Sequence, residues 1–280
     1  MSFEKQEAFP ICKINLGLNV VRRRNDGYHD LETVFYPVPL HDNLSIAPLR
    51  LSDAPYALQT VGAPIAGDAE SNLIVKVYKQ LCEDYELPPL DIYLYKRIPM
   101  GAGLGGGSSD AAAMMRLLND TFALGMTCEE MEHRVARLGA DCAFFIQARP
   151  SFATGIGDQL TPIDLSLRGW TLVLVKPDTF VSTKEAYGGI TPRQPDVALT
   201  EALLRPVEEW RAVVRNDFEE SVFRAHPEIA AIKATLYDMG AAFALMSGSG
   251  STVFALFRHH MDSLDEVFPD CFVYQATLKL

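Results

Sequence analysis

The 280-residue sequence lacks most of the features that mark secreted, membrane and metal-stabilised proteins. Its five cysteines form no C-x-x-C pair, which argues against a zinc site or a disulfide framework and suits reduced thiols. No apolar run is long enough to span a bilayer, and the first residues do not have the basic and apolar regions of a signal peptide. We therefore expect a cytoplasmic protein.

Basic residues are also scarce, because 25 Lys and Arg stand against 36 Asp and Glu, a formal net charge of −11. A protein that coats DNA or RNA needs clustered Lys and Arg, so we expect no nucleic-acid partner and no membrane partner. An anionic substrate must then be attracted locally, by backbone amides, a helix N-terminus or a metal ion. The chain is 48% hydrophobic, enough for a core, and its length favours two domains.

The hydrophobic pattern predicts strands mixed with helices. Strands are expected over residues 14–21, 31–38, 43–47, 91–98, 170–176, 243–246 and 252–257. Helices are expected over residues 72–85, from 109 with Ala111, Met114, Met115 and Leu118 inward, from 127 to 139, and from 227 to 240. Residues 52–70 and 191–206 are predicted as loops with a short strand and a short helix respectively. Hairpin-like strand pairs favour an α+β fold over a doubly wound parallel sheet.

A glycine-rich loop between a predicted strand and a predicted helix is the clearest functional signal. It consists of Pro99, Met100, Gly101, Ala102, Gly103, Leu104, Gly105, Gly106, Gly107, Ser108 and Ser109. Glycine allows close approach of the backbone, so successive N–H groups can surround phosphate oxygens at the positive end of the following helix. The two serines add hydroxyls that bond a phosphate, cap the helix or reach a magnesium ion. The loop therefore predicts phosphate binding.

Other phosphate loops fit this segment less well. A Walker A loop ends in Gly-Lys-Ser/Thr, and no lysine follows these glycines. Gly101, Gly103 and Gly106 match the dinucleotide pattern, but Pro99 and the amphipathic strand before it do not suit that fold. The downstream motifs of protein kinases are missing from the sequence. A dehydrogenase and a catalytically silent nucleotide sensor stay as alternatives.

Three segments, residues 10–18, 99–109 and 247–251, resemble the motifs of the GHMP kinase superfamily. Residues 26–33, 71–75, 96–100 and 139–142 resemble the branch that acts on a cytidine diphosphate derivative of methylerythritol. The resemblance runs in order from about residue 9 to residue 257. It implies an ATP-dependent kinase that uses Mg²⁺ and phosphorylates the 2-hydroxyl of that small molecule, in the non-mevalonate route to isoprenoid precursors. Homoserine or mevalonate-type kinases of the same superfamily are the alternative.

The resemblance also implies the fold and the domains. Residues 1–158 form an ATP-binding and catalytic domain like the second domain of ribosomal protein S5, and residues 159–280 form a ferredoxin-like domain. Lys13 and Asp141 are implied as the catalytic pair, with Asp141 as the base. The residues themselves agree, because a lysine in an apolar run and an acid beside an apolar segment each need a partner when buried.

The resemblance assigns the remaining site residues. Asn72 and Lys96 join the loop around ATP, although a helix cap and an exposed strand lysine are their plain alternatives. The implied substrate residues are Asn15, Tyr28, His29, Thr183, Tyr187, Gly248 and Gly250, with the two tyrosines enclosing the cytosine ring. Position 187 is commonly Phe, so the hydroxyl departs from the pattern. Ser109 and Asp110 are candidate metal ligands, with Asp110 alternatively a first-turn acid, and no ligand is assigned. The sequence leaves the oligomeric state undetermined.

Overall fold

The computed structural model describes residues 3–50, 54–65 and 67–280. These residues form two compact units, each discontinuous along the chain. The first unit comprises Met1–Cys12, Leu40–Met100 and Gly105–Ala148, and the second comprises Lys13–Pro39, Gly101–Leu104 and Arg149–Leu280. Strands β2 (Ile11–Arg23) and β3 (His29–His41) run from one unit into the other. The domain boundary near residue 158 stays a prediction, and we describe each unit by itself.

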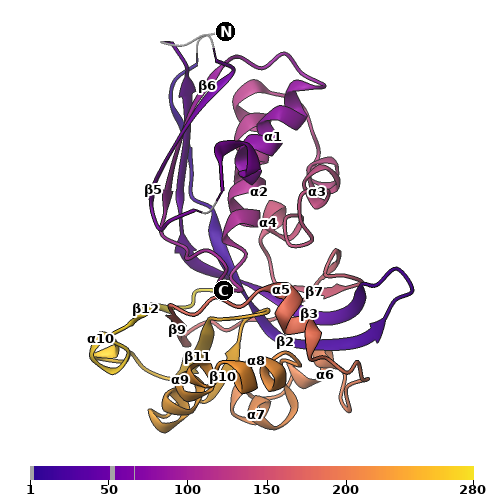
Figure 1. The fold of residues 1–280 in the computed structure, drawn as a ribbon, viewed down its shortest axis with the longest axis vertical. Coiled ribbons are helices and arrows are strands. Elements are labelled where there is room, and N and C mark those ends of the chain that lie inside the picture. The colour runs from indigo at the N-terminus through magenta and orange to yellow at the C-terminus, as the bar shows by residue number, and fades with distance from the viewer. Residues whose placement is uncertain (1–2, 51–53, 66) are drawn as a thin grey trace. The chain divides into compact units, whose positions relative to one another are not determined.

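The first unit is a four-stranded sheet with helices on one face, as Figure 1 shows for α1 and α2. The strand order is β1-β4-β6-β5, with β5 parallel to β6 and the other neighbours antiparallel. Its elements are β1 (Gln6–Ala8), β4 (Asn43–Pro48), β5 (Tyr56–Gly62), η1 (Ala69–Ser71), α1 (Leu73–Cys82), β6 (Leu90–Lys96), α2 (Gly106–Phe122), α3 (Cys128–Ala136) and α4 (Phe144–Gln147).

Sequence periodicity explains how this unit packs. Strand β6 alternates between buried and exposed residues along its whole length, so Lys96 falls on the buried side with Ile92 and Leu94. The predicted inner side of α2, Ala111, Met114, Met115 and Leu118, is buried. Asn72 caps α1 by accepting the Ile74 N–H at 3.0 Å. The predicted inner side of α2 is therefore confirmed, the helix cap that stands as the alternative for Asn72 is present, and the ATP role of Asn72 stays a prediction.

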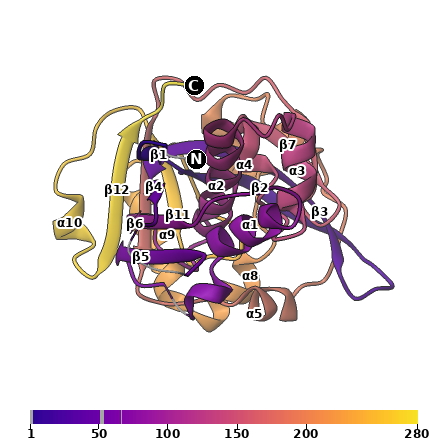
Figure 2. The same cartoon turned by 90° about the horizontal axis from the view of Figure 1, so that it is seen from above.

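The second unit contains two four-stranded sheets, β10-β11-β9-β12 and β2-β3-β7-β8. Helix α10 lies beside the edge strand β12 (Figure 2). The further elements are β7 (Ser151–Thr154), β8 (Gln159–Pro162), β9 (Thr171–Pro177), α5 (Thr183–Gly188), α6 (Leu199–Ala202), η2 (Val207–Glu209), α7 (Trp210–Val213), α8 (Glu219–Ala225), α9 (Pro227–Asp238), β10 (Phe243–Met246), β11 (Val253–Phe257), α10 (Leu264–Val267) and β12 (Cys271–Thr277).

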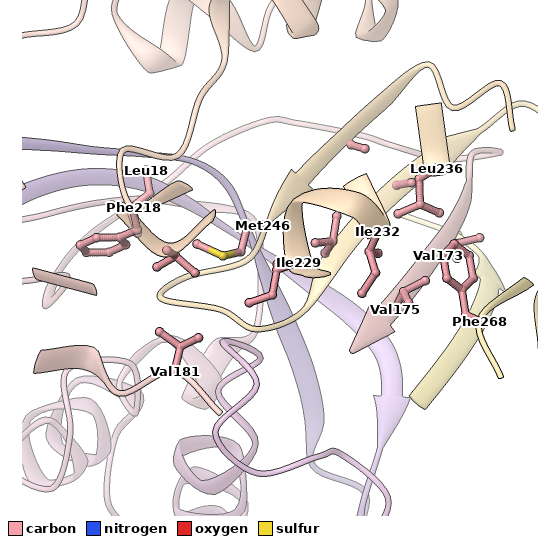
Figure 3. Close-up of a cluster of buried hydrophobic side chains, with 14 of the residues drawn as sticks. Leu18, Val173, Val175, Val181, Phe218, Ile229, Ile232, Leu236, Met246 and Phe268 are labelled. Atoms are coloured by element: carbon pink, nitrogen blue, oxygen red, sulfur yellow. The ribbon is translucent and has the colours of Figure 1, made fainter. Parts of the chain in front are cut away.

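Helix α9 supplies much of the hydrophobic core of the second unit. Ile229, Ile232 and Leu236 lie on its inner side, at the helical spacing that the sequence predicts, and face Val173 and Val175 of β9 (Figure 3). All five side chains are at most 7% exposed. The apolar face of α9 therefore anchors the sheet that carries the turn at residues 247–251.

The structure differs from the predictions mainly where contacts are non-local. Residues 56–62 form a full strand of seven residues, because they pair with β6, whereas the pattern indicates mostly loop. Helix α3 ends at Ala136 rather than at Gly139, since the Leu138 N–H turns back to Val135 O at 2.9 Å. Residues 51–53 and 66, in or beside the predicted loop, and Met1 and Ser2 lie outside the described residues. Within the described part of the chain, no helix is long and apolar enough to cross a membrane.

Candidate active site

The glycine loop contributes to both units, so its two halves are described separately. Gly101–Leu104 belongs to the second unit, while Pro99, Met100 and the residues from Gly105 onward belong to the first. The predicted substrate residues all lie in the second unit, together with Lys13. The other predicted ATP residues lie in the first unit, together with Asp141.

In the second unit, the turn at residues 247–251 holds the loop segment 101–104. The Ser247 hydroxyl donates to Gly103 O at 2.8 Å, and the Thr252 N–H donates to Ala102 O at 3.4 Å. Gly103 has a φ of +72°, and a Cβ added there would lie 1.9 Å from Ser247 O. Only glycine meets both conditions, so the close approach of the two segments explains this glycine.

Lys13 is buried, as the sequence predicts, with 3% of its surface exposed. Its backbone N–H donates to Leu104 O at 3.0 Å, which ties β2 to the loop. Its amino group donates to Asn15 Oδ1 at 2.6 Å and lies 4.8 Å from the centroid of the Phe35 ring. A carbonyl oxygen and an aromatic face both stabilise a buried ammonium group. The lysine is therefore held in a defined position.

The aromatic side chains predicted to hold the substrate do not all meet. His29 stacks on Tyr187 with ring centroids 4.9 Å apart and an interplanar angle of 21°. Phe218 contacts Tyr187 edge-on at 4.8 Å, whereas Tyr28 is 62% exposed. Thus two residues of the implied substrate set, His29 and Tyr187, lie against each other. Enclosure of a ring by Tyr28 and Tyr187 stays a prediction.

The other predicted substrate residues lie at the start of α5 and in the turn 247–251. Thr183 is the first residue of α5, which Ser182 caps by accepting the Glu185 N–H at 3.1 Å. Gly248 has a φ of +57°, and a Cβ added there would lie 3.3 Å from Asn15 Oδ1. Gly250 also has a positive φ, of +91°. Gly248 is therefore a neighbour of Asn15, and two residues that bind the same substrate must lie near each other.

In the first unit, helix α2 begins at the second half of the glycine loop. Its N-cap is Gly105, with a φ of +70° and no side chain to cap the helix. The first N–H groups of a helix have no partner within it, and the helix dipole makes that end positive. The serines therefore do not provide the cap, and this helix end is suited to bind phosphate oxygens.

Asp141 lies in the turn before α4 and is half-buried. The next residue, Cys142, hydrogen-bonds to Ser108 of α2, which places this turn against the first turn of that helix. Burial raises the pKa of the Cys142 thiol to about 11, and the nearby Asp141 carboxylate adds to the rise. Since the thiolate is the reactive form, this rise lowers the reactivity of Cys142 at neutral pH. The predicted base and the predicted phosphate site are thus neighbours within one unit.

A buried charge cluster lies beneath the start of α2. The Lys96 amino group contacts Asp42 and lies 2.8 Å from Asp110 Oδ2, with all three side chains at most 5% exposed. Asp42 Oδ1 accepts the N–H groups of Arg97 and Ile98 at 2.6 and 2.8 Å. Lys96 is therefore not an exposed strand lysine. Asp110 is the fifth residue of α2, so its interpretation as a first-turn acid is wrong.

Asp42 is the member of this cluster that the sequence does not reveal. It follows β3 and precedes β4, where an acid normally marks a solvated turn. Burial raises the pKa of Asp110 to about 8; Asp42 adds to the rise and Lys96 opposes it. The pKa of Lys96 is raised by its two carboxylate partners, against the effect of its own burial. Asp110 is therefore partly protonated near neutral pH.

The raised pKa of Asp110 predicts a dependence of stability on pH. An unfolded Asp has a pKa of about 3.9, so between about pH 4 and pH 8 the folded state holds a proton that the unfolded state releases. This stabilisation is full below pH 4 and is lost as the pH rises to about 8. We expect Asp110→Asn to flatten the decline, measured by urea unfolding between pH 5 and 8. Asp91→Asn, on the exposed side of β6, is the control, and equal slopes for wild type and Asp110→Asn would contradict the prediction.

Comparisons with known proteins identify the family of the chain. Residues 72–149 match the family model of the GHMP kinases N terminal domain, and residues 199–266 match that of the GHMP kinases C terminal domain. The 4-diphosphocytidyl-2-C-methyl-D-erythritol kinase of Bacteroides fragilis is 54% identical over 271 residues, which cover 97% of this chain and 99% of that protein. The enzyme of the same name from Parabacteroides distasonis is 51% identical, with the same coverage.

Solved structures show the same fold. A crystal structure of 4-(cytidine 5'-diphospho)-2C-methyl-D-erythritol kinase superposes with a TM-score of 0.83, at 31% identity, covering 98% of this chain and all of that one. Homoserine kinase from Cytophaga hutchinsonii superposes with a TM-score of 0.66 at 18% identity, covering 99% and 96% of the two chains, which supports the fold alone. The chain therefore belongs to the GHMP kinases, in the 4-diphosphocytidyl-2-C-methyl-D-erythritol kinase family, and uses ATP.

Proposed function

We propose that this chain transfers the γ-phosphate of ATP to the 2-hydroxyl of 4-diphosphocytidyl-2-C-methyl-D-erythritol, a step in non-mevalonate isoprenoid precursor synthesis. The observation that carries the proposal is the identity of 51 to 54% over 97% of the chain to relatives named for that substrate. A homoserine or mevalonate-type activity has no comparable support, because likenesses below 20% identity concern only the fold.

In this proposal, the second unit recognises the cytidine end of the substrate. Tyr187 offers an aromatic face, with His29 stacked on it and the exposed Tyr28 in the same unit. Stacking of a base on an aromatic side chain contributes about 1–3 kcal/mol in nucleic-acid complexes. Asn15, Thr183, Gly248 and Gly250 complete the proposed substrate set. The histidine supplies polar nitrogens beside the ring, as recognition of a pyrimidine edge requires.

ATP is held by the glycine loop and the start of α2 in this proposal, with Asn72 and Lys96 toward the adenosine. Lys96 is buried between two carboxylates, one of which, Asp110, belongs to α2. In this proposal Lys96 therefore affects ATP binding in two ways, by fixing the position of α2 and by direct contact with the nucleotide. Asn72 also caps α1 through its side-chain oxygen, which leaves the amide nitrogen for the nucleotide.

Mg²⁺ is the proposed metal, and when bound with ATP it would neutralise charge on the phosphates. The described residues contain no group of three or more His, Cys, Asp or Glu arranged to hold a metal ion. Asp110 Oδ1 has no hydrogen-bond partner among them, and Ser109 precedes it at the start of α2. One carboxylate oxygen and one hydroxyl fit an ion that keeps mostly phosphate and water ligands.

The two proposed catalytic residues, Asp141 and Lys13, have different roles in the reaction of the hydroxyl. Asp141 accepts the proton of the 2-hydroxyl as its oxygen attacks the γ-phosphorus and ADP leaves. Lys13 provides a positive charge that keeps a nearby carboxylate ionised and offsets charge on the transferring group. The start of α2 stabilises the phosphates through its N–H groups.

A coupled ADP-release assay across a panel of alcohols tests the proposal. We expect turnover with the cytidyl-diphospho substrate and none with homoserine or mevalonate. We also expect CDP and CMP to compete with the substrate and to protect the enzyme from heat, whereas UMP serves as the control. Turnover with homoserine or mevalonate alone would move the chain to another branch of GHMP kinases. Failure of every cytidine compound to bind would remove the substrate assignment and leave the kinase class.

A further inference from the structure

A chain of buried polar groups in the second unit includes the amino group of Lys13. Its members are Lys13, Asn15, Thr33 and Ser247, which are all at most 3% exposed. They come from strands β2 and β3 and from the turn 247–251. Thr33 belongs to no predicted site, because a threonine in a strand is ordinarily explained by packing. The directions of the hydrogen bonds give it a more specific role.

The Thr33 hydroxyl has one proton, and that proton is already committed. It donates to the backbone oxygen of Gly17 at 2.6 Å. The Thr33 oxygen can then only accept, and it accepts from Asn15 Nδ2 at 2.9 Å. The side-chain amide of Asn15 is therefore held with its nitrogen toward Thr33. Its oxygen must point the other way.

That oxygen faces Lys13. Asn15 Oδ1 accepts from the Lys13 amino group at 2.6 Å, in a buried site where such a charge-assisted bond is strong. If the Asn15 amide turned over, the two hydrogens of its NH₂ group would face the ammonium group, and Lys13 would lose this hydrogen bond. The hydroxyl of Thr33 thus decides whether Asn15 attracts or repels the amino group of Lys13.

Ser247 reinforces the same arrangement from the other side. Its hydroxyl donates to Gly103 O at 2.8 Å, the shorter of two contacts, since Asn15 Oδ1 lies at 3.5 Å. The Ser247 oxygen accepts the backbone N–H of Asn15 at 3.2 Å. The backbone of Asn15 is therefore fixed relative to the loop segment 101–104, and only the side-chain amide depends on Thr33.

We propose that Thr33 is a positioning residue for the reaction, which orients the Asn15 amide so that its oxygen holds the amino group of Lys13. The inference rests on the proposed function, because it takes Lys13 as a residue that acts on the reacting groups. It goes further in naming a residue outside the proposed substrate and ATP sets, which controls the lysine through a single intervening side chain. A displacement of a catalytic group by about 1 Å costs up to 10²-fold in rate.

The pair Thr33→Val and Thr33→Ser tests this role. Valine keeps the shape of threonine and removes the hydroxyl, while serine keeps the hydroxyl. We expect Thr33→Val to lower kcat by about 10- to 100-fold with the KM for ATP changed by less than about threefold. Thr33→Ser should stay within about threefold of wild type, because it rescues the hydrogen bonds. A purely structural role would lower stability and leave the turnover of the folded enzyme unchanged, so thermal unfolding of each variant is measured alongside.

A double-variant cycle with Lys13→Met separates this inference from the proposed function. If Thr33 acts through Lys13, adding Thr33→Val to Lys13→Met should cost less than about threefold more. Loss of activity in Lys13→Met with normal kcat in Thr33→Val would overturn the role of Thr33 alone. Normal turnover in Lys13→Met would overturn both the catalytic role of Lys13 and this inference. Should Thr33→Val not accumulate as folded protein, Thr33→Ala is judged by the same criteria.

Discussion

Asp141→Asn is expected to lower kcat by about two or more orders of magnitude, because general-base steps contribute about 10²–10⁴-fold in rate. The amide has nearly the shape of the carboxylate and cannot accept the hydroxyl proton. ATP binding should persist, since the start of α2 and its N–H groups are unaltered. Single-turnover kinetics with a separate measurement of ATP affinity would distinguish a lost chemical step from lost binding.

Lys13→Met is the companion variant, and we expect a loss of similar size. Asp91→Asn provides the matched control for Asp141→Asn, because it makes the same chemical change on the exposed side of β6. The control should retain wild-type turnover. Near-normal turnover of Asp141→Asn would remove Asp141 from the role of base, whatever the behaviour of Lys13→Met.

Lys96→Met is expected to lower the free energy of unfolding by about 3–5 kcal/mol, because it leaves the buried Asp42 carboxylate and the ionised fraction of Asp110 without their cation. Asp42 and Asp110 have at most 5% of their side chains exposed, so water cannot replace the ammonium group. The variant should also lose the fixed position of α2, since Asp110 is in that helix. Urea unfolding followed by circular dichroism at pH 7 measures the loss.

Two further variants give this prediction its controls. Lys76→Met removes an exposed lysine from α1 and should change stability by no more than about 0.5 kcal/mol. Adding Asp42→Asn and Asp110→Asn to Lys96→Met removes the unpaired charges, and the amide introduced by Asp42→Asn retains an oxygen for the N–H groups of Arg97 and Ile98. This triple variant should regain at least about 1 kcal/mol. A cost below about 1 kcal/mol for Lys96→Met alone would show that the cluster contributes little.

Much of the candidate site could be predicted because its signals are local. The glycines of residues 101–107 indicate a phosphate loop by composition, and the alternation along β6 indicates a strand with one buried and one exposed face. The apolar run around Lys13 predicts its burial. In each case, the prediction depends on neighbouring residues alone, either on the hydrophobic pattern along the chain or on the backbone freedom of glycine.

Other parts of the site could not be predicted, because they depend on partners far away in the sequence. Asp42 and Lys96 are 54 residues apart, and neither position shows that the other exists. The stack of His29 on Tyr187 joins a strand to a helix far along the chain, and neither position shows that the two rings meet. Thr33 has the appearance of an ordinary strand residue.

The sequence by itself determined the family and the alternation of β6, favoured the burial of Lys13 and predicted phosphate binding by the loop, because short-range patterns and motifs carry these signals. Only the tertiary structure decided that Lys96 is shared between two carboxylates, that Gly103 must approach Ser247, and that the hydroxyl of Thr33 directs the Asn15 amide toward Lys13. The physical reason is that a buried polar group must find its partner in space. The chain brings these partners together only when its sheets and helices pack.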